Sequence, residues 1–168
     1  LRRLRIAMNG YRRDSQSAHF LFLSAAILET SHRIPNLDYD ILMKLTLQLT
    51  KSMEECEKLY RLMCFNVFAH NRDDHSKNFS YIYRDEEKRW ILSPAYDLTY
   101  SNSIGGEHAT TVNGNGADPG MDDLLSVAKK IGLGMTKARK TAAEIQDEIA
   151  FWQDTPGEDY ALNQTANN

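Results

Sequence analysis

The sequence has 168 residues, 42% of them hydrophobic, and a net charge of −3. This length allows one domain with its own core and is too short for two large ones. The charge gives no general attraction to nucleic acid or to a membrane, and no apolar run approaches the roughly 20 residues that span a bilayer. We therefore expect a cytoplasmic protein with one domain over residues 1–153 and a polar, disordered tail over residues 154–168.

The first third of the chain predicts two helices after a basic start. Residues 1–13 hold five arginines, which indicate either an anion- or nucleic-acid-binding patch or a solvated segment. The apolar stretch 18–29 predicts a helix, and residues 38–50, with leucines at helical spacing, predict a second one. The chain begins with leucine, so we expect that it was cut from a longer polypeptide.

A third helix is predicted to follow Ser52, which forms a capping-box pattern with Glu55. The second half of this helix, residues 62–68, is apolar nearly all round apart from Asn66, so it should enter the core and hold the next segment rigidly. Cys56 and Cys64 would lie about 12 Å apart on it, beyond the reach of a disulfide. We expect two buried free thiols in a reducing compartment.

The remaining elements predict a mainly α fold of the α+β class, a helical bundle with one β-hairpin. Residues 79–83 and 89–92 are rich in aromatic and β-branched residues and flank a turn at Asp85–Lys88. Residues 101–120 contain five glycines and three asparagines and predict a long, mobile loop. Helices are expected at 122–131 and, capped by Thr136, at 136–152, with one apolar face on the latter.

Two short motifs carry the chemistry: His70–Asn78, which reads HNRDDHSKN, and Ser93–Leu98, which reads SPAYDL. Phosphoryl transfer needs a carboxylate to receive a hydroxyl proton, and oxygen ligands for Mg²⁺. A hairpin centred near Glu86 would place Asn78 opposite Pro94 and fold Asp97 back toward Asn78. The pattern therefore predicts a magnesium site between Asn78 and Asp97, with Asp73 beside it facing an acceptor hydroxyl.

Other functions are compatible with the same residues. Taken singly, each of these polar residues is more often a turn or cap residue than a catalytic one. His70, Asp73, Asp74 and His75 could be ligands of a metal-dependent phosphohydrolase, although the other histidines have no matching motif. A kinase-like lobe kept only as a non-catalytic binding module is the second alternative.

The two motifs strongly resemble the C-terminal lobe of HipA-like serine/threonine kinases. The resemblance includes Phe65-Asn66-Val67, Val112-Asn113-Gly114 and the helix start at Asp122-Asp123, and it covers roughly residues 10–152. It implies a protein-kinase-like lobe with its hairpin at the catalytic cleft. It implies further that Asp73 is the catalytic base and that Asn78 and Asp97 bind Mg²⁺. His75 and Lys77 would lie at the phosphates of ATP, and Tyr96 beside the nucleotide.

The resemblance also implies partners that the chain itself does not contain. Gly10 is the only glycine before residue 105, so no glycine-rich phosphate loop precedes the motifs, and Asp97-Leu98-Thr99 lacks the glycine of the common Asp-Phe-Gly motif. The missing parts would belong to an N-terminal lobe of the same polypeptide, and we expect this chain alone to be inactive. The full-length kinase would phosphorylate a serine or threonine of a protein substrate. Family members typically act as toxins held inactive by a small DNA-binding antitoxin.

Overall fold

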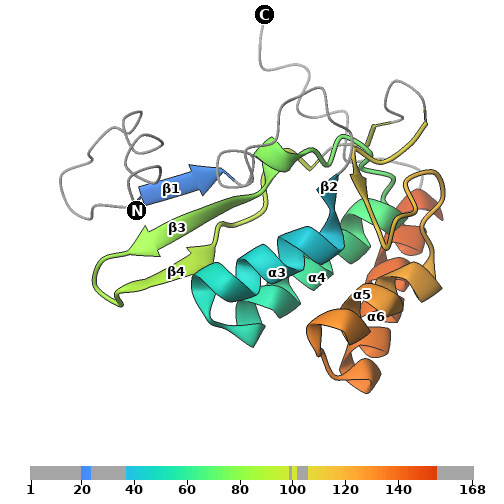
Figure 1. Cartoon of the computed structure of the whole chain (residues 1–168). Helices are drawn as coiled ribbons and strands as arrows, with labels where there is room; N and C mark the ends of the chain where they lie inside the picture. Colours follow the sequence, from blue (N-terminus) through green and yellow to red (C-terminus); the bar gives the residue numbers. More distant parts are fainter. Residues whose placement is uncertain (1–19, 24–36, 99, 102–105, 155–168) are drawn as a thin grey trace, which may run out of the picture.

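A computed structural model describes residues 20–23, 37–98, 100–101 and 106–154 of the chain (Figure 1). The described part is mixed α and β, with four α-helices and a few short strands. In chain order these are β1 (Phe20–Leu23), β2 (Leu37–Asp38), α3 (Tyr39–Thr50), α4 (Met53–Phe68), the 3₁₀ helix η2 (Ser76–Asn78), β3 (Ser80–Arg84), β4 (Arg89–Leu92), β5 (Thr110–Thr111), α5 (Met121–Ile131) and α6 (Met135–Asp154).

The second and third predicted helices are present as α3 and α4. The Asp38 side chain caps α3 by accepting a hydrogen bond from the Asp40 N–H at 2.7 Å. The predicted capping box of α4 is wrong, because the Ser52 side chain makes no cap hydrogen bond. The Glu55 carboxylate is instead buried and accepts the Leu92 N–H from β4 at 2.9 Å. Glu55 therefore makes a tertiary hydrogen bond to β4 and not the local capping hydrogen bond that the sequence pattern predicts.

The two strands predicted around Asp85–Lys88 are β3 and β4, which pair antiparallel. Their register places Tyr81 opposite Leu92, one residue away from the register expected for a turn centred on Glu86. A hydrogen bond from the Ser93 N–H to the Ser80 carbonyl, 2.9 Å long, continues the pairing beyond the strand ends. The turn lies at the far end of the sheet from the two motifs (Figure 1).

The predicted helix at 18–29 is wrong where the structure describes it. Phe20–Leu23 form the strand β1, which pairs antiparallel with β3 and completes a sheet of order β1-β3-β4. The remaining residues of that stretch lie outside the described residues, as do the arginine-rich segment 1–13 and residues 155–168. A strand that pairs with a distant segment is thus present where apolar content alone suggested a helix.

Helix α4 lies at the centre of the core, packed against α3 and α6 (Figure 1). Helix α5 ends, as predicted, at Gly132, whose positive φ of 86° suits glycine. The apolar stripe of α6 is confirmed, since Ala138, Ala142 and Ile145 are buried. Cys56 and Cys64 are buried free thiols, also as predicted, and burial raises their pKa values to about 11 and about 12.

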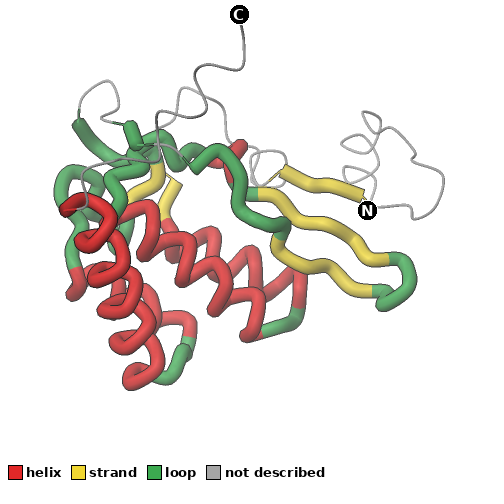
Figure 2. Tube along the Cα trace, turned by 180° about the vertical axis from the view of Figure 1, so that it is seen from behind, coloured by secondary structure: helices red, strands yellow, loops and turns green. Residues whose placement is uncertain are grey.

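The predicted loop 101–120 contains more structure than expected. Thr110–Thr111 form β5, which pairs in parallel with β2, and Ser101 forms a parallel bridge with Asn71. Residues 102–105 lie outside the described residues. Seen from behind, a group of loops lies at one end of the helices, and the turns that join α3 to α4 and α5 to α6 lie at the other end (Figure 2). Among the described helices, none is both long and apolar enough to cross a membrane.

Candidate functional site

Helix α4 leads directly into the segment 70–78 that carries the first motif. The chain leaves the helix through His70, whose φ of 52° lies in the left-handed region. The Asn71 N–H then donates to the Asn66 carbonyl at 2.9 Å. Because the second half of α4 is held in the core, this segment starts from a fixed position, as the apolar pattern predicts.

Asp73 presents an accessible carboxylate on this segment. Its side chain is 55% exposed, and its Oδ1 lies 3.8 Å from Nε2 of His75, beyond hydrogen-bond distance. Its backbone carbonyl accepts a hydrogen bond from Asn78 Nδ2 at 2.8 Å. The backbone of Asp73 is therefore held in place while its side chain is available to an incoming group.

The Asn78 side chain has a defined orientation. A carbonyl only accepts hydrogen bonds, so the amide nitrogen of Asn78 must face the Asp73 carbonyl and its Oδ1 must point the other way. An amide oxygen and a carboxylate oxygen are hard donors of the kind that Mg²⁺ prefers. Asn78 and Asp97 therefore fit such an ion by the chemistry of their donor atoms.

Three hydrogen bonds hold the second motif and the residues that follow it beside the first motif and the start of β3. Near its start, the Ser93 and Ser80 hydroxyls lie 2.7 Å apart. In its middle, the Tyr96 hydroxyl donates to the Lys77 carbonyl at 2.6 Å. Past its end, the Ser101 N–H donates to the His70 carbonyl at 3.2 Å.

Asp97 lies within this fastened stretch. It is exposed, and its φ of 56° places it in the left-handed region, which aspartate tolerates better than most residues. The structure thus brings the backbone of the Asp97 segment alongside the segment that carries Asp73 and Asn78. The meeting of the Asp97 carboxylate with the Asn78 oxygen stays a prediction.

His75 and Lys77, the residues expected at the phosphates, lie between Asp73 and Asn78. The His75 side chain is 42% exposed, and Lys77 is exposed on η2. Within the described part of the chain, Nδ1 of His75 and Nε of Arg72 are buried without a hydrogen-bond partner. His75 and Lys77 thus lie on the same short segment as Asp73, and the side chains of both are at least partly accessible.

Asp74 has a different environment from Asp73, which the sequence did not indicate. It is 1% exposed, and its carboxylate accepts hydrogen bonds from the Tyr39 hydroxyl at 3.1 Å and the Thr110 N–H at 3.1 Å. Nδ1 of His108 lies 3.2 Å from the same carboxylate. Asp74 is thus a structural group that joins α3 and β5 to the motif.

This placement separates Asp74 from the ligand set of the alternative phosphohydrolase. That set needs the carboxylate of Asp74 beside those of the neighbouring motif residues. In the part of the chain that the structure describes, no three His, Cys, Asp or Glu side chains gather as metal ligands. The alternative thus gains no support from the arrangement of these side chains.

Asn66 and Tyr39 are further site residues that the sequence analysis did not identify as such. Both are buried, and Asn66 Nδ2 donates to the Tyr39 hydroxyl at 2.9 Å. Asn66 gave a usable signal, because it is the one polar residue in an otherwise apolar helix end. Tyr39 gave none, since a tyrosine at the start of an amphipathic helix is an ordinary core residue.

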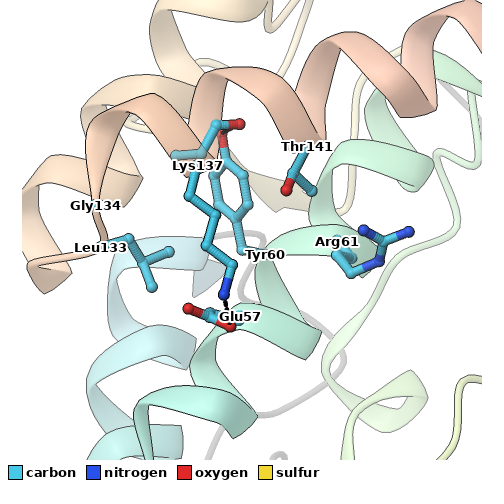
Figure 3. Close-up of a pocket in the computed structure, with 8 residues that line it drawn as sticks. Glu57, Tyr60, Arg61, Leu133, Gly134, Lys137 and Thr141 are labelled. Carbon is cyan, nitrogen blue, oxygen red and sulfur yellow. Dashed lines mark hydrogen bonds and ion pairs between the residues drawn. The ribbon is translucent and has the colours of Figure 1, made fainter.

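Concave surfaces lie beside the second motif and also away from it. A hollow of about 850 Å³ between α4 and α6 includes Ala95, Leu98 and Tyr100 in its lining, close to Asp97 in the sequence. A separate pocket of about 220 Å³ lies between α4 and the start of α6, where Lys137 pairs with Glu57 at 2.6 Å (Figure 3). The smaller pocket contains no residue of either motif.

The fold resembles that of a solved HipA from Shewanella oneidensis MR-1. The structure is described as the toxin–antitoxin system HipA, HipB and its operator DNA complex, and it matches with a TM-score of 0.58 and 15% sequence identity. The match covers 91% of this chain and 42% of that HipA chain, so this chain spans less than half the length of that protein. At this identity the match shows a shared fold.

The sequence itself matches a family model over most of its length. No curated protein sequence matches the chain. The model described as the HipA-like C-terminal domain matches residues 11–152, which include both motifs and the helices around them. The chain therefore belongs to the family of HipA-like C-terminal domains.

Proposed function

We propose that this chain is the C-terminal, kinase-like lobe of a HipA-like protein serine/threonine kinase. With an N-terminal lobe of the same polypeptide, it transfers the γ-phosphoryl group of ATP to a serine or threonine hydroxyl of a protein in the cytoplasm. One observation carries the proposal: the segment with Asp97 is fastened along the segment with Asp73 and Asn78. The β3–β4 hairpin, whose open end joins these segments, lies at the catalytic cleft.

Asp73 is the catalytic base in this proposal. Its exposed carboxylate accepts the proton of the acceptor hydroxyl as that oxygen attacks the γ-phosphorus. The bond between the γ-phosphorus and the bridging oxygen breaks, and ADP carries away that oxygen. The fixed backbone of Asp73 keeps the base in one place, which matters because small errors in position slow such reactions strongly.

Asn78 and Asp97 would hold Mg²⁺ in this proposal. When bound, the ion supplies positive charge that neutralises the phosphate oxygens of ATP. His75 and Lys77 add hydrogen-bond donors and a positive charge at the phosphates. Tyr96, whose hydroxyl is held by the Lys77 carbonyl, lies beside the nucleotide.

The proposal includes a small DNA-binding antitoxin as partner. The HipA with the similar fold is described in a complex with HipB and operator DNA. We extend that partnership to this chain on the basis of the family and of the fold. The protein substrate is a second partner, defined by its serine or threonine hydroxyl.

The test is Asp73→Asn in the polypeptide that joins this chain to its N-terminal lobe. Removing a general base lowers the rate by roughly 100-fold or more, so we expect kcat to fall by at least that factor. Stability should change by less than about 0.5 kcal/mol, because the Asp73 side chain is exposed. Radiolabelled phosphate transfer and thermal unfolding measure the two effects.

Glu86→Gln is the matched control, since it removes one negative charge from the exposed hairpin turn. Its kcat should equal that of the wild type. An unchanged kcat in Asp73→Asn would remove Asp73 from its assigned role. A wild-type polypeptide that neither binds Mg·ATP nor transfers phosphate would overturn the kinase proposal itself.

A further inference from the structure

The residues on both sides of the Arg72–Asp73 pair are buried and hydrogen-bonded. Asn71 is 2% exposed, and its Nδ2 donates to Asn66 Oδ1 at 2.9 Å. Asp74 is 1% exposed and accepts the Thr110 N–H. The segment is therefore anchored immediately before and immediately after the pair that contains the proposed base.

One hydroxyl group connects these two anchors. The Tyr39 hydroxyl accepts a hydrogen bond from Asn66 Nδ2 at 2.9 Å and donates one to Asp74 Oδ2 at 3.1 Å. A continuous buried path thus runs from Asn71 through Asn66 and Tyr39 to Asp74. Such a network holds a defined geometry only while every member has its partner.

The surroundings of Tyr39 suit this connecting role. The residue is fully buried, and its ring packs edge-on against Phe79 with the ring centroids 5.6 Å apart. Burial, together with the charge of Asp74, raises the pKa of Tyr39 well above its ordinary value. The hydroxyl therefore keeps its proton and remains a donor to Asp74.

We infer that Tyr39 is a positioning residue for the phosphoryl transfer proposed above. It acts by locking the backbone on both sides of Asp73, so that the neighbouring carboxylate stays directed at the acceptor hydroxyl. Loss of the Tyr39 hydroxyl would leave an amide donor of Asn66 buried without its partner, and Asp74 Oδ2 would keep only His108 Nδ1, at 3.2 Å. Burying a polar group without a hydrogen-bond partner costs free energy, so the segment would open and let water form the missing hydrogen bond.

The test compares Tyr39→Phe with Tyr60→Phe in the complete polypeptide. Tyr60 is a matched control, because it is also buried and its hydroxyl donates one hydrogen bond, to the Ala138 carbonyl at 3.3 Å, away from the motifs. Native-state hydrogen exchange is followed by mass spectrometry of peptides that contain the Asn71 and Thr110 amides. Both amides bond to members of the network.

In Tyr39→Phe we expect these two peptides to exchange at least about tenfold faster, while peptides of α5 exchange as in the wild type. In Tyr60→Phe the two peptides should keep the wild-type rate. Unchanged exchange in Tyr39→Phe would overturn the inference. Equal acceleration in every peptide would also overturn it, because Tyr39 would then support the whole fold.

Kinetics provide the second measurement. We expect Tyr39→Phe to lower kcat by about tenfold and to leave the KM for Mg·ATP within about twofold, as for misplacement of a group that acts in the transition state. Local opening combined with an unchanged kcat would contradict the positioning role. A wild-type protein without kinase activity would instead contradict the proposed function, while the exchange comparison would still decide whether Tyr39 holds the segment.

Discussion

At the scale of single residues, the adjacent acidic pair Asp73 and Asp74 shows how environment assigns roles. Although the two residues are neighbours in the sequence, the fold exposes one side chain and buries the other. The Asp74 side chain faces the core, where tyrosine, histidine and backbone groups surround it, whereas the Asp73 side chain is 55% exposed. Only the exposed carboxylate is accessible to a substrate hydroxyl.

Glu55 is a second buried carboxylate, and both of its oxygens have hydrogen-bond partners. Its Oε2 accepts the Leu92 N–H at 2.9 Å, and its Oε1 lies 2.8 Å from Nζ of Lys58. It ties α4 to the end of β4, five residues before Asp97. We expect Glu55→Gln to lower the free energy of unfolding by about 1–3 kcal/mol, because the buried bonds lose their charge. Urea denaturation measures this loss.

Glu54→Gln is the control for this prediction. Glu54 pairs with the same lysine at 3.1 Å, but its side chain is 70% exposed. Exposed pairs contribute little, so this variant should lie within about 0.5 kcal/mol of the wild type. Equal losses in the two variants would show that burial of Glu55 is unimportant.

At the scale of elements, the sequence predicted the helices better than the strands. Helices α3 to α6 carry apolar residues at helical spacing, and that signal is local. β1 was missed because Phe20–Leu23 is a short apolar run, and its strand conformation depends on pairing with β3, some 60 residues later. Its partner, not its own composition, decides its structure.

The candidate site shows the same difference between local sequence signals and contacts with distant residues. The motif residues are predicted from chemistry and spacing within two short segments, and their roles stay predictions. The anchoring residues could not be predicted, because Tyr39 and Thr110 each lie about 35 residues from Asp74. Contacts of that separation follow from the packing of α3 and β5 and leave no local pattern.

The start of α5 gives a prediction for a single element. The Asp123 carboxylate accepts hydrogen bonds from the Gly120 N–H, Asn115 and Asn113. Burial alone would raise the pKa of Asp123, but these hydrogen bonds outweigh it and hold the pKa below its ordinary value. The ionised group therefore stabilises α5. Asp123→Asn should cost about 1 kcal/mol at pH 7 in urea denaturation.

The sign of the pH dependence follows from the lowered pKa. The stabilisation is fully present above the unfolded-state pKa, near 4, and is lost as the pH falls through the lower folded-state value. The difference between wild type and Asp123→Asn should therefore shrink below about pH 4. Asp122→Asn, at an exposed position in the same turn, should cost only a few tenths of a kcal/mol. If the stability difference between wild type and Asp123→Asn does not change with pH, the stabilising role of the ionised Asp123 carboxylate is contradicted.

At the scale of the whole molecule, the helices form a scaffold that presents both motifs at one end (Figure 1). Helix α4 carries the first motif at its end, and through Glu55 it also holds the strand that leads to the second. The two motifs are thus attached to one helix that is packed on several sides. This arrangement explains how a domain with short strands can hold the candidate site in a fixed geometry.

The proposed division of labour between this chain and an N-terminal lobe yields the last prediction. Before residue 105 the chain has one glycine, Gly10, so nothing that precedes the two motifs resembles a glycine-rich loop that covers the phosphates of ATP. We expect the 168 residues alone to transfer no more phosphate from Mg·ATP to a protein substrate than their own Asp73→Asn variant does. When the chain is joined to its N-terminal lobe, the rate of phosphate transfer should be at least about 100-fold higher with Asp73 than in the Asp73→Asn variant. Robust transfer by the 168 residues alone, abolished by Asp73→Asn, would mean that this chain binds and activates ATP without a second lobe.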